Sequence, residues 1–456
     1  MNNMSMIVAK AAPALLARAR RTAGSLLTLS AFLLGACSTD NLLSVDTPDI
    51  VTPDNLAGGA GLAVLRAGAF GDLALAVGGA AAGHGSTPGL VHYVSSFTDE
   101  VTYSGTFPTR RQFDERRVQD DIGDVNNLFR NIHRARASAE FAAATVEKAS
   151  STDPRRSELL SLAGFAYVFL GENFCSGVPI STATQSGDLE YGEPLTTQKI
   201  FEQAVGIFDR ALTGTSTTSP ERNLASVGKG RALLNLGRFP EAAQALAAVP
   251  TSFRLDLEFS TNSTRQQNGV YALSGVDRQY SVSERESPNG MPFRSLGDPR
   301  VVWARTEGEV GQDGATAFFL QKMYDTPSAP FRLATGTEAR LIEAEAALRA
   351  NDVTKFAGIH MALRASINLP AVDVVPMSAE QRVDFHFRER ALWLWLSAHR
   401  LSDMRRLVRQ YARSATSVFP SGPYFKGGTY GTDVNFPLPV SELNNPKFKG
   451  CLDRLP

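Results

Sequence analysis

Residues 388–406 decide the fold, and they read Arg388-Glu389-Arg390-Ala391-Leu392-Trp393-Leu394-Trp395-Leu396-Ser397-Ala398-His399-Arg400-Leu401-Ser402-Asp403-Met404-Arg405-Arg406. The run lies in a predicted helix over 378–411, which begins with a capping box of Ser378 and Gln381. Four of its side chains lie close to one helix face: Leu392, Leu396, His399 and Asp403. The two tryptophans of the run point in other directions, so we expect this helix to be buried on more than one side.

Three charged residues within this run, Arg390, Arg400 and Asp403, have apolar neighbours at helical spacing. An isolated charge is very costly to bury, so charges in such surroundings are expected to pair. The pattern is more typical of a buried ion-pair network that holds the last helices together than of a ligand site.

Helical periodicity also covers most of the chain before this run. Helices are predicted at 120–149, directly after Pro154, at 197–212, and in two helix hairpins at 221–249 and 338–367. The first hairpin, with its small residues and the tight turn at Gly237, resembles a tetratricopeptide unit. Ordinary helix hairpins explain the pattern nearly as well, and both interpretations predict an α-rich body.

Residues 251–335 have a different composition, rich in Ser, Thr, Asn, Gly and Arg with isolated aromatic residues. Irregular segments of this length in a compact protein are usually functional or disordered. The interleaved aromatics argue against plain disorder. After residue 411 the sequence changes again, to turns and short strands.

The amino terminus carries the pattern of an export signal. Arg20 and Arg21 precede an apolar run at 26–34, which is too short to cross a bilayer as a helix. The run ends in Leu34-Gly35-Ala36-Cys37, which resembles the bacterial lipobox. We therefore expect a signal peptide at 1–36, a lipid on Cys37 and a polar tether to residue 54. The alternative is a buried cysteine at the end of an amphipathic helix.

The remaining two cysteines, Cys175 and Cys451, would then lie in an oxidising compartment. That setting favours a disulfide between them, and the alternative is two unrelated buried thiols. Neither cysteine has the spacing of a metal ligand.

Charge and motif content exclude several classes of function. The first 36 residues hold four basic residues and no acid, so the rest of the chain has 42 basic and 46 acidic residues. A mildly acidic body lacks the clustered cations that nucleic-acid binding requires. The sequence also lacks H-E-x-x-H, G-x-S-x-G and Walker motifs. It therefore predicts no catalytic residues, no cofactor and no metal.

The order of motifs along the chain resembles that of the SusD/RagB family of nutrient-uptake lipoproteins. After the lipobox, the motifs that carry the resemblance are Thr98-Asp99-Glu100, Asp298-Pro299-Arg300, Ala344-Glu345-Ala346, the run 388–406, and Leu438-Pro439-Val440-Ser441-Glu442-Leu443. The chain departs from the family pattern at Ser397-Ala398, where the family has Glu-Gly.

The resemblance implies a mainly α, SusD-like fold with tetratricopeptide-like hairpins, long irregular loops and a few short strands. The whole of 55–456 would form this domain, with a helical body at 55–250 and 336–411. Residues 251–335 would form a loop-rich ligand face, and 412–456 a segment of turns and strands.

The resemblance also implies a function. The family consists of lipid-anchored proteins, exposed on the cell outer membrane, that bind an oligosaccharide or a peptide. They deliver it to a TonB-dependent, SusC-like transporter. Aromatic rings that stack on sugar faces would suit such a site.

Six residues are the candidate ligand contacts. Phe97, Asp99 and Tyr103 lie beside the early family motif, and Tyr280, Trp303 and Tyr324 lie in the long irregular segment. For the aromatic residues the alternative is a ring packed on the body of the protein.

Two other functions remain open from the sequence. A tetratricopeptide-type scaffold for envelope assembly would show an exposed apolar groove and no small-molecule pocket. A surface glycosidase would need two carboxylates facing each other across a cleft, about 5–10 Å apart. A nutrient-binding lipoprotein would instead show a pocket lined by aromatics from 251–335.

Overall fold

The computed structural model describes residues 58–81, 87–183 and 188–456. The proposed signal peptide, Cys37 and the tether lie outside these residues. The helices of the described part are α2 (Gly59–Gly78), α3 (Leu90–Phe97), α4 (Pro108–Asp114), α5 (Gly123–Ala149), α6 (Pro154–Asn173), α7 (Thr197–Leu212), α8 (Pro220–Asn235), α9 (Phe239–Leu246), α10 (Gly336–Arg349), α11 (Val353–Ala365), α12 (Ala379–Trp393), α13 (Arg400–Tyr411) and α14 (Ala415–Val418).

The helices predicted between residues 120 and 367 are confirmed, and polar caps explain where several helices of the chain begin. Asp153 accepts a hydrogen bond from the backbone N–H of Arg155 at the start of α6, and Pro154 occupies the first helical turn. Ser378 and Gln381 form the predicted capping box of α12.

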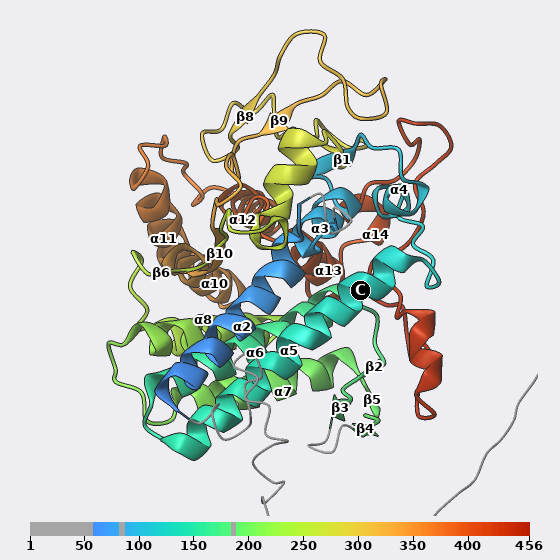
Figure 1. Cartoon of the computed structure of the whole chain (residues 1–456). Helices are drawn as coiled ribbons and strands as arrows, with labels where there is room; N and C mark the ends of the chain where they lie inside the picture. The colour runs from blue at the N-terminus through green and yellow to red at the C-terminus, as the bar shows by residue number, and fades with distance from the viewer. Residues whose placement is uncertain (1–57, 82–86, 184–187) are drawn as a thin grey trace, which may run out of the picture. The chain divides into compact units, whose positions relative to one another are not determined.

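Successive helices pack on one another from α5 to α11, α5 on α6, α6 on α7 and so on along the chain (Figure 1). Glycines allow the close approach of α6, α7 and α8. A Cβ added to Gly164 or Gly228 would lie 2.6 or 2.2 Å from the ring of Phe208 on α7. The hairpins α8–α9 and α10–α11 coincide with the two tetratricopeptide-like hairpins expected from the sequence.

Helix α2 is long and apolar enough to cross a membrane by length and composition, with a mean hydropathy of 1.6. It nevertheless packs on α5 and α6 and is tied to them by charge. Arg66 pairs with Glu158 of α6 at 2.5 Å, and Asp72 pairs with Arg134 of α5 at 3.0 Å. These contacts make α2 an outer helix of the folded body.

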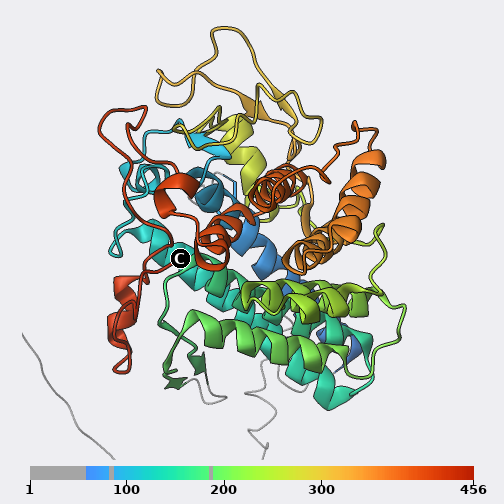
Figure 2. The same ribbon diagram turned by 180° about the vertical axis from the view of Figure 1, so that it is seen from behind.

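The strands are short and form two-stranded pairs. They are β1 (Val101–Tyr103) with β7 (Tyr280–Val282), β2 (Val178–Pro179) with β5 (Pro194–Leu195), β3 (Thr182–Ala183) with β4 (Leu189–Glu190), β6 (Arg254–Leu257) with β10 (Phe331–Thr335), and β8 (Trp303–Ala304) with β9 (Leu320–Gln321). Figures 1 and 2 show β8, β9 and the loops around them at the opposite end of the folded body from α5, α7 and α8.

The periodicity of residues 378–411 predicts one helix, but the structure has two, α12 and α13. Between α12 and α13 the chain turns, with Leu396 and Ala398 at φ of 54° and 59°. The backbone N–H of Leu396 donates to the Glu100 carboxylate at 2.8 Å, and its carbonyl accepts from the Tyr324 hydroxyl at 2.9 Å. These buried contacts to distant segments outweigh the local helical preference, and left-handed backbone at a non-glycine residue persists only under such restraint.

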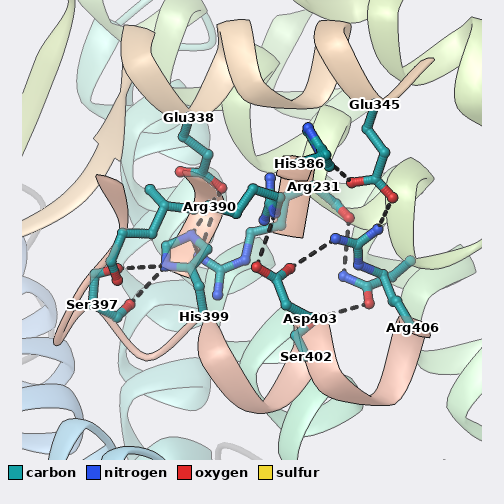
Figure 3. Close-up of polar contacts among 12 residues, drawn as sticks. Arg231, Glu338, Glu345, His386, Arg390, Ser397, His399, Ser402, Asp403 and Arg406 are labelled. Atoms are coloured by element: carbon teal, nitrogen blue, oxygen red, sulfur yellow. Dashed lines mark hydrogen bonds and ion pairs between the residues drawn. The ribbon is translucent and has the colours of Figure 1, made fainter. Parts of the chain in front are cut away.

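The turn brings the two helices together through the ion pairs shown in Figure 3. Arg390 of α12 and Asp403 of α13, predicted to belong to a network, lie 2.9 Å apart. Asp403 also pairs with Arg406 at 2.7 Å, and Arg406 pairs with Glu345 of α10. Burial opposes the ionised form of Asp403, but Arg390 and Arg406 lower its pKa to about 2. The network therefore joins α10, α12 and α13 in a charged state.

A second group of ion pairs ties the remaining motifs to the same two helices. Arg400 forms two hydrogen bonds with Asp99, at 2.7 and 2.8 Å. Arg300 bridges Asp298 and Glu389, each at 2.7 Å. Every one of these side chains is buried or nearly so. The motifs at 98–100, 298–300, 344–346 and 388–406 thus contribute buried ion pairs that hold the core together, whereas Leu443 of the last motif is exposed.

Cys175 and Cys451 form a disulfide with their Cα atoms 5.7 Å apart. Cys175 follows α6, and Cys451 lies in the last residues of the chain. The backbone N–H of Leu452 adds a hydrogen bond to the Ser176 carbonyl at 2.8 Å. The carboxyl-terminal segment is therefore held against the end of α6.

We predict that Arg406→Met lowers the free energy of unfolding by about 3–5 kcal/mol, because it leaves Glu345 and Asp403 as buried charges without this partner. Urea denaturation followed by circular dichroism measures the change. The matched control is Arg413→Met, which breaks a largely exposed pair with Asp384. That variant is expected to lose at most about 1 kcal/mol. Equal losses in the two variants would contradict the assigned role of the network.

Candidate ligand site

The structure places five of the six predicted ligand contacts in the interior, so that prediction is corrected for them. The Phe97 ring is fully buried and lies 5.2 Å from the ring of Phe436. The Asp99 carboxylate is occupied by Arg400. Both residues hold the core together and are not available to a ligand at the surface.

The three tyrosines are also buried, and they pack or hydrogen-bond within the protein. The Tyr103 hydroxyl accepts a hydrogen bond from the backbone N–H of Phe107 at 2.9 Å. The ring of Tyr280, its partner on the neighbouring strand, lies 5.3 Å away. Tyr324 donates to the Leu396 carbonyl. Trp303 alone stays partly exposed, with its ring 5.6 Å from the ring of Phe319.

A pocket of about 560 Å³ opens on the loop-rich end of the molecule, close to these residues. Its walls come from β1, from β7 and the residues after it, from the loop before β9, and from the segment after α14. The lining residues are Thr102, Ser281, Val282, Glu284, Glu286, Arg294, Asp313, Ala315, Thr316, Ala317, Phe319, Phe425 and Lys426.

Asp313 organises one wall of this pocket. Its carboxylate accepts hydrogen bonds from the backbone N–H groups of Ala315 and Thr316 and from the Thr316 hydroxyl. It also pairs with Lys426 at 2.8 Å. Burial alone would raise its pKa, but these donors lower it to about 2. Its contribution to stability is therefore complete above the ordinary pKa near 4 and is lost as the pH falls through about 2.

A partly buried acid also lines the pocket. Glu286 accepts hydrogen bonds from the hydroxyls of Thr102 and Tyr430. Behind it, the Asp114 carboxylate accepts from the Tyr424 hydroxyl at 2.7 Å and from the backbone N–H of Tyr103 at 3.0 Å. Burial raises the pKa of both carboxyls, the charge of Glu286 raises that of Asp114 further, and the charge of Asp99 raises that of Glu286.

The aromatic surfaces of the pocket are Phe319 and Phe425. The guanidinium of Arg294 lies over the Phe319 ring, 3.4 Å from its centroid. The Phe425 ring is 48% exposed, whereas Phe319 is 8% exposed. Phe425 therefore offers the more open face to a bound molecule.

Comparison with known proteins adds the decisive observation. No protein family's sequence profile matches the chain, and no curated protein resembles it in sequence. Solved structures do match the chain in fold. A SusD superfamily protein from Parabacteroides distasonis, 12% identical, has a TM-score of 0.65 over 86% of this chain and 98% of its own. One from Bacteroides thetaiotaomicron, 17% identical, has a TM-score of 0.63 over 86% of this chain and 100% of its own.

The chain has the SusD fold. A "SusD-like carbohydrate binding protein" from Bacteroides vulgatus gives the same result, with 15% identity and a TM-score of 0.63 over 85% of this chain and 97% of its own. The mainly α prediction and the resemblance to the family of this fold are confirmed in architecture.

In this SusD-like chain, sequence reasoning missed Phe425 and Lys426, because the segment after residue 411 showed only turns and strands. A signal was present in Tyr424-Phe425-Lys426-Gly427-Gly428, which places an aromatic and a basic residue in a glycine-rich loop. Gly427 and Gly428 have φ of 99° and 77°, a conformation that glycine adopts without strain. The loop folds back so that the backbone N–H of Tyr424 donates to the Gly428 carbonyl.

We predict that Asp313→Asn increases amide hydrogen exchange in residues 422–430, because the ion pair with Lys426 is one of the contacts that fix this loop. Mass spectrometry of peptides measures the change. Asp256→Asn, which removes a pair with Arg254 on β6, is the control and should leave 422–430 unchanged. If the loop exchanges equally in the parent and in Asp313→Asn, Lys426 does not anchor it.

Proposed function

We propose that this chain is a lipid-anchored protein of the bacterial outer membrane that binds an oligosaccharide in the pocket between Phe319 and Phe425. It then delivers the sugar to a TonB-dependent, SusC-like transporter. The observation that carries the proposal is an open pocket, with aromatic and charged walls, on the loop-rich end of a SusD fold.

The chemistry of the pocket supports sugar binding. Its volume of about 560 Å³ suits a small ligand. An exposed phenyl ring such as that of Phe425 can stack on the apolar face of a sugar ring, while charged and hydroxyl side chains bind its hydroxyl groups. Structural neighbours from Bacteroides vulgatus and Bacteroides fragilis are described as SusD-like carbohydrate binding proteins.

The alternatives have less support. A protein scaffold does not need this pocket. A glycosidase needs carboxylates free to act on substrate, whereas Glu284 and Asp313 are both engaged by hydrogen bonds from neighbouring loops. The arrangement favours binding over hydrolysis.

We predict that Phe425→Ala weakens oligosaccharide binding about tenfold, since it removes the exposed stacking surface. Isothermal titration calorimetry against a panel of oligosaccharides measures the affinity. Phe141→Ala is the matched control, because that ring is 53% exposed on α5 and does not line the pocket. Failure of the parent protein to bind any oligosaccharide would overturn the proposal, and equal effects of the two variants would remove the pocket from it.

Delivery and anchoring require a separate measurement. We expect the native protein, purified from detergent-solubilised outer membranes, to carry a TonB-dependent transporter in near-equal amount by mass spectrometry. Cys37→Ser should release the protein from the membrane fraction, because the lipid attaches to that sulfur. Recovery of assembly factors without a transporter would support the scaffold instead.

A further inference from the structure

The hydrogen-bonding capacity that the pocket leaves open defines the ligand that it suits. Its acids are largely engaged within the protein. Asp313 accepts four hydrogen bonds, two at each oxygen. Glu284 accepts from the backbone N–H groups of Arg294 and Ser295 and from the Ser295 hydroxyl. Few acceptor positions therefore remain for the donors of a ligand.

The guanidinium of Arg294, by contrast, has few hydrogen-bond partners within the protein. Its Nε donates only a long hydrogen bond, 3.4 Å, to the Ser283 carbonyl. Its nearest carboxylate, that of Glu284, is 3.8 Å from Nε. Within the described part of the chain, neither terminal amino group of Arg294 has a hydrogen-bond acceptor. The guanidinium thus retains most of its donors.

A second guanidinium adds positive charge to the same wall. Arg305 lies 4.8 Å from the centroid of the Phe319 ring, on which Arg294 also packs. Arg305 forms no ion pair with any of the described acidic residues. Two arginines therefore lie around one ring, and the carboxylates that act on Arg294 are those of Glu284, 3.8 Å from Nε, and of Glu286.

We propose that the ligand is an acidic oligosaccharide, and that Arg294 is the specificity-determining residue that binds a sugar carboxylate. The inference rests on the proposed function and names the substrate class of the same pocket. A guanidinium presents parallel N–H donors that match the two oxygens of a carboxylate. Packing on Phe319 holds that fork in place before the ligand arrives, so less conformational entropy is lost on binding.

Two of the three acids of the pocket, Asp313 and Glu286, are offset within the protein, and the third, Glu284, is the carboxylate 3.8 Å from Nε of Arg294. Lys426 balances the charge of Asp313 at 2.8 Å. Burial raises the pKa of Glu286, which favours its neutral form. Burial also lowers the pKa of Arg294, with Arg305 acting in the same direction, so a ligand carboxylate would relieve an unfavourable charge. Lys426 keeps two N–H donors for neighbouring sugar hydroxyls.

The test uses oligosaccharides that differ only in charge. Tetragalacturonate and its methyl ester form one pair, and oligomers of glucuronate and mannuronate with their esters form two more. Calorimetry of the full chain in detergent should show at least one acidic member binding about tenfold more tightly than its ester. The preference should decrease as salt is raised.

The variants assign the preference to one side chain. Arg294→Gln should abolish the difference between acid and ester, and Arg294→Lys should restore part of it. Arg285→Gln is the matched control, since Arg285 is exposed, near in sequence and outside the lining of the pocket. Circular dichroism and the melting temperature establish that each variant folds.

The outcomes separate this inference from the proposed function. If esters and other neutral oligosaccharides bind as tightly as the acids, or if Arg294→Gln keeps the acid preference, the inference is wrong and the binding function stands. If neither acidic nor neutral oligosaccharides bind the parent protein, the proposed function itself fails.

Discussion

The fold depends on charge buried between α10, α12 and α13. Arg406 can lie in the core only because Glu345 and Asp403 are there to receive it. Taking such groups out of water costs several kcal/mol per ion, and only close pairing offsets that cost. The pair between Arg390 and Asp403 holds α12 and α13 together on the two sides of the turn at Leu396.

The turn between α12 and α13 is linked to the loop-rich end of the molecule through Leu396. Leu396 is held by Glu100 on one side and by Tyr324 on the other. Glu100 directly precedes β1, which pairs with β7 and carries Thr102 into the pocket wall. The pocket is therefore built on the buried network through a short chain of backbone contacts.

This arrangement explains how similarity in fold can persist at 12–17% identity. Motif residues form buried pairs, Asp99 with Arg400 and Glu345 with Arg406, so they are constrained by the core. The pocket residues Arg294, Phe319 and Phe425 come from loops, which tolerate change. Resemblance in the motifs consequently identifies the architecture and leaves the choice of ligand to the loops.

The sequence by itself determined the helices and their order, because helical periodicity and caps such as Asp153 and Ser378 act within a few residues. It also identified Arg390 and Asp403 as members of a buried ion-pair network. It could not show that Tyr103, Tyr280 and Tyr324 would be buried, since an aromatic in an irregular segment looks the same whether it faces a ligand or the core.

Only the tertiary structure decided where the pocket lies. Thr102, Phe319 and Phe425 are separated by more than a hundred residues from one to the next, and no local pattern records that they meet. The break at Leu396 was hidden for the same reason. Its local sequence favours a helix, and the contacts that prevent one come from residues far away in the chain.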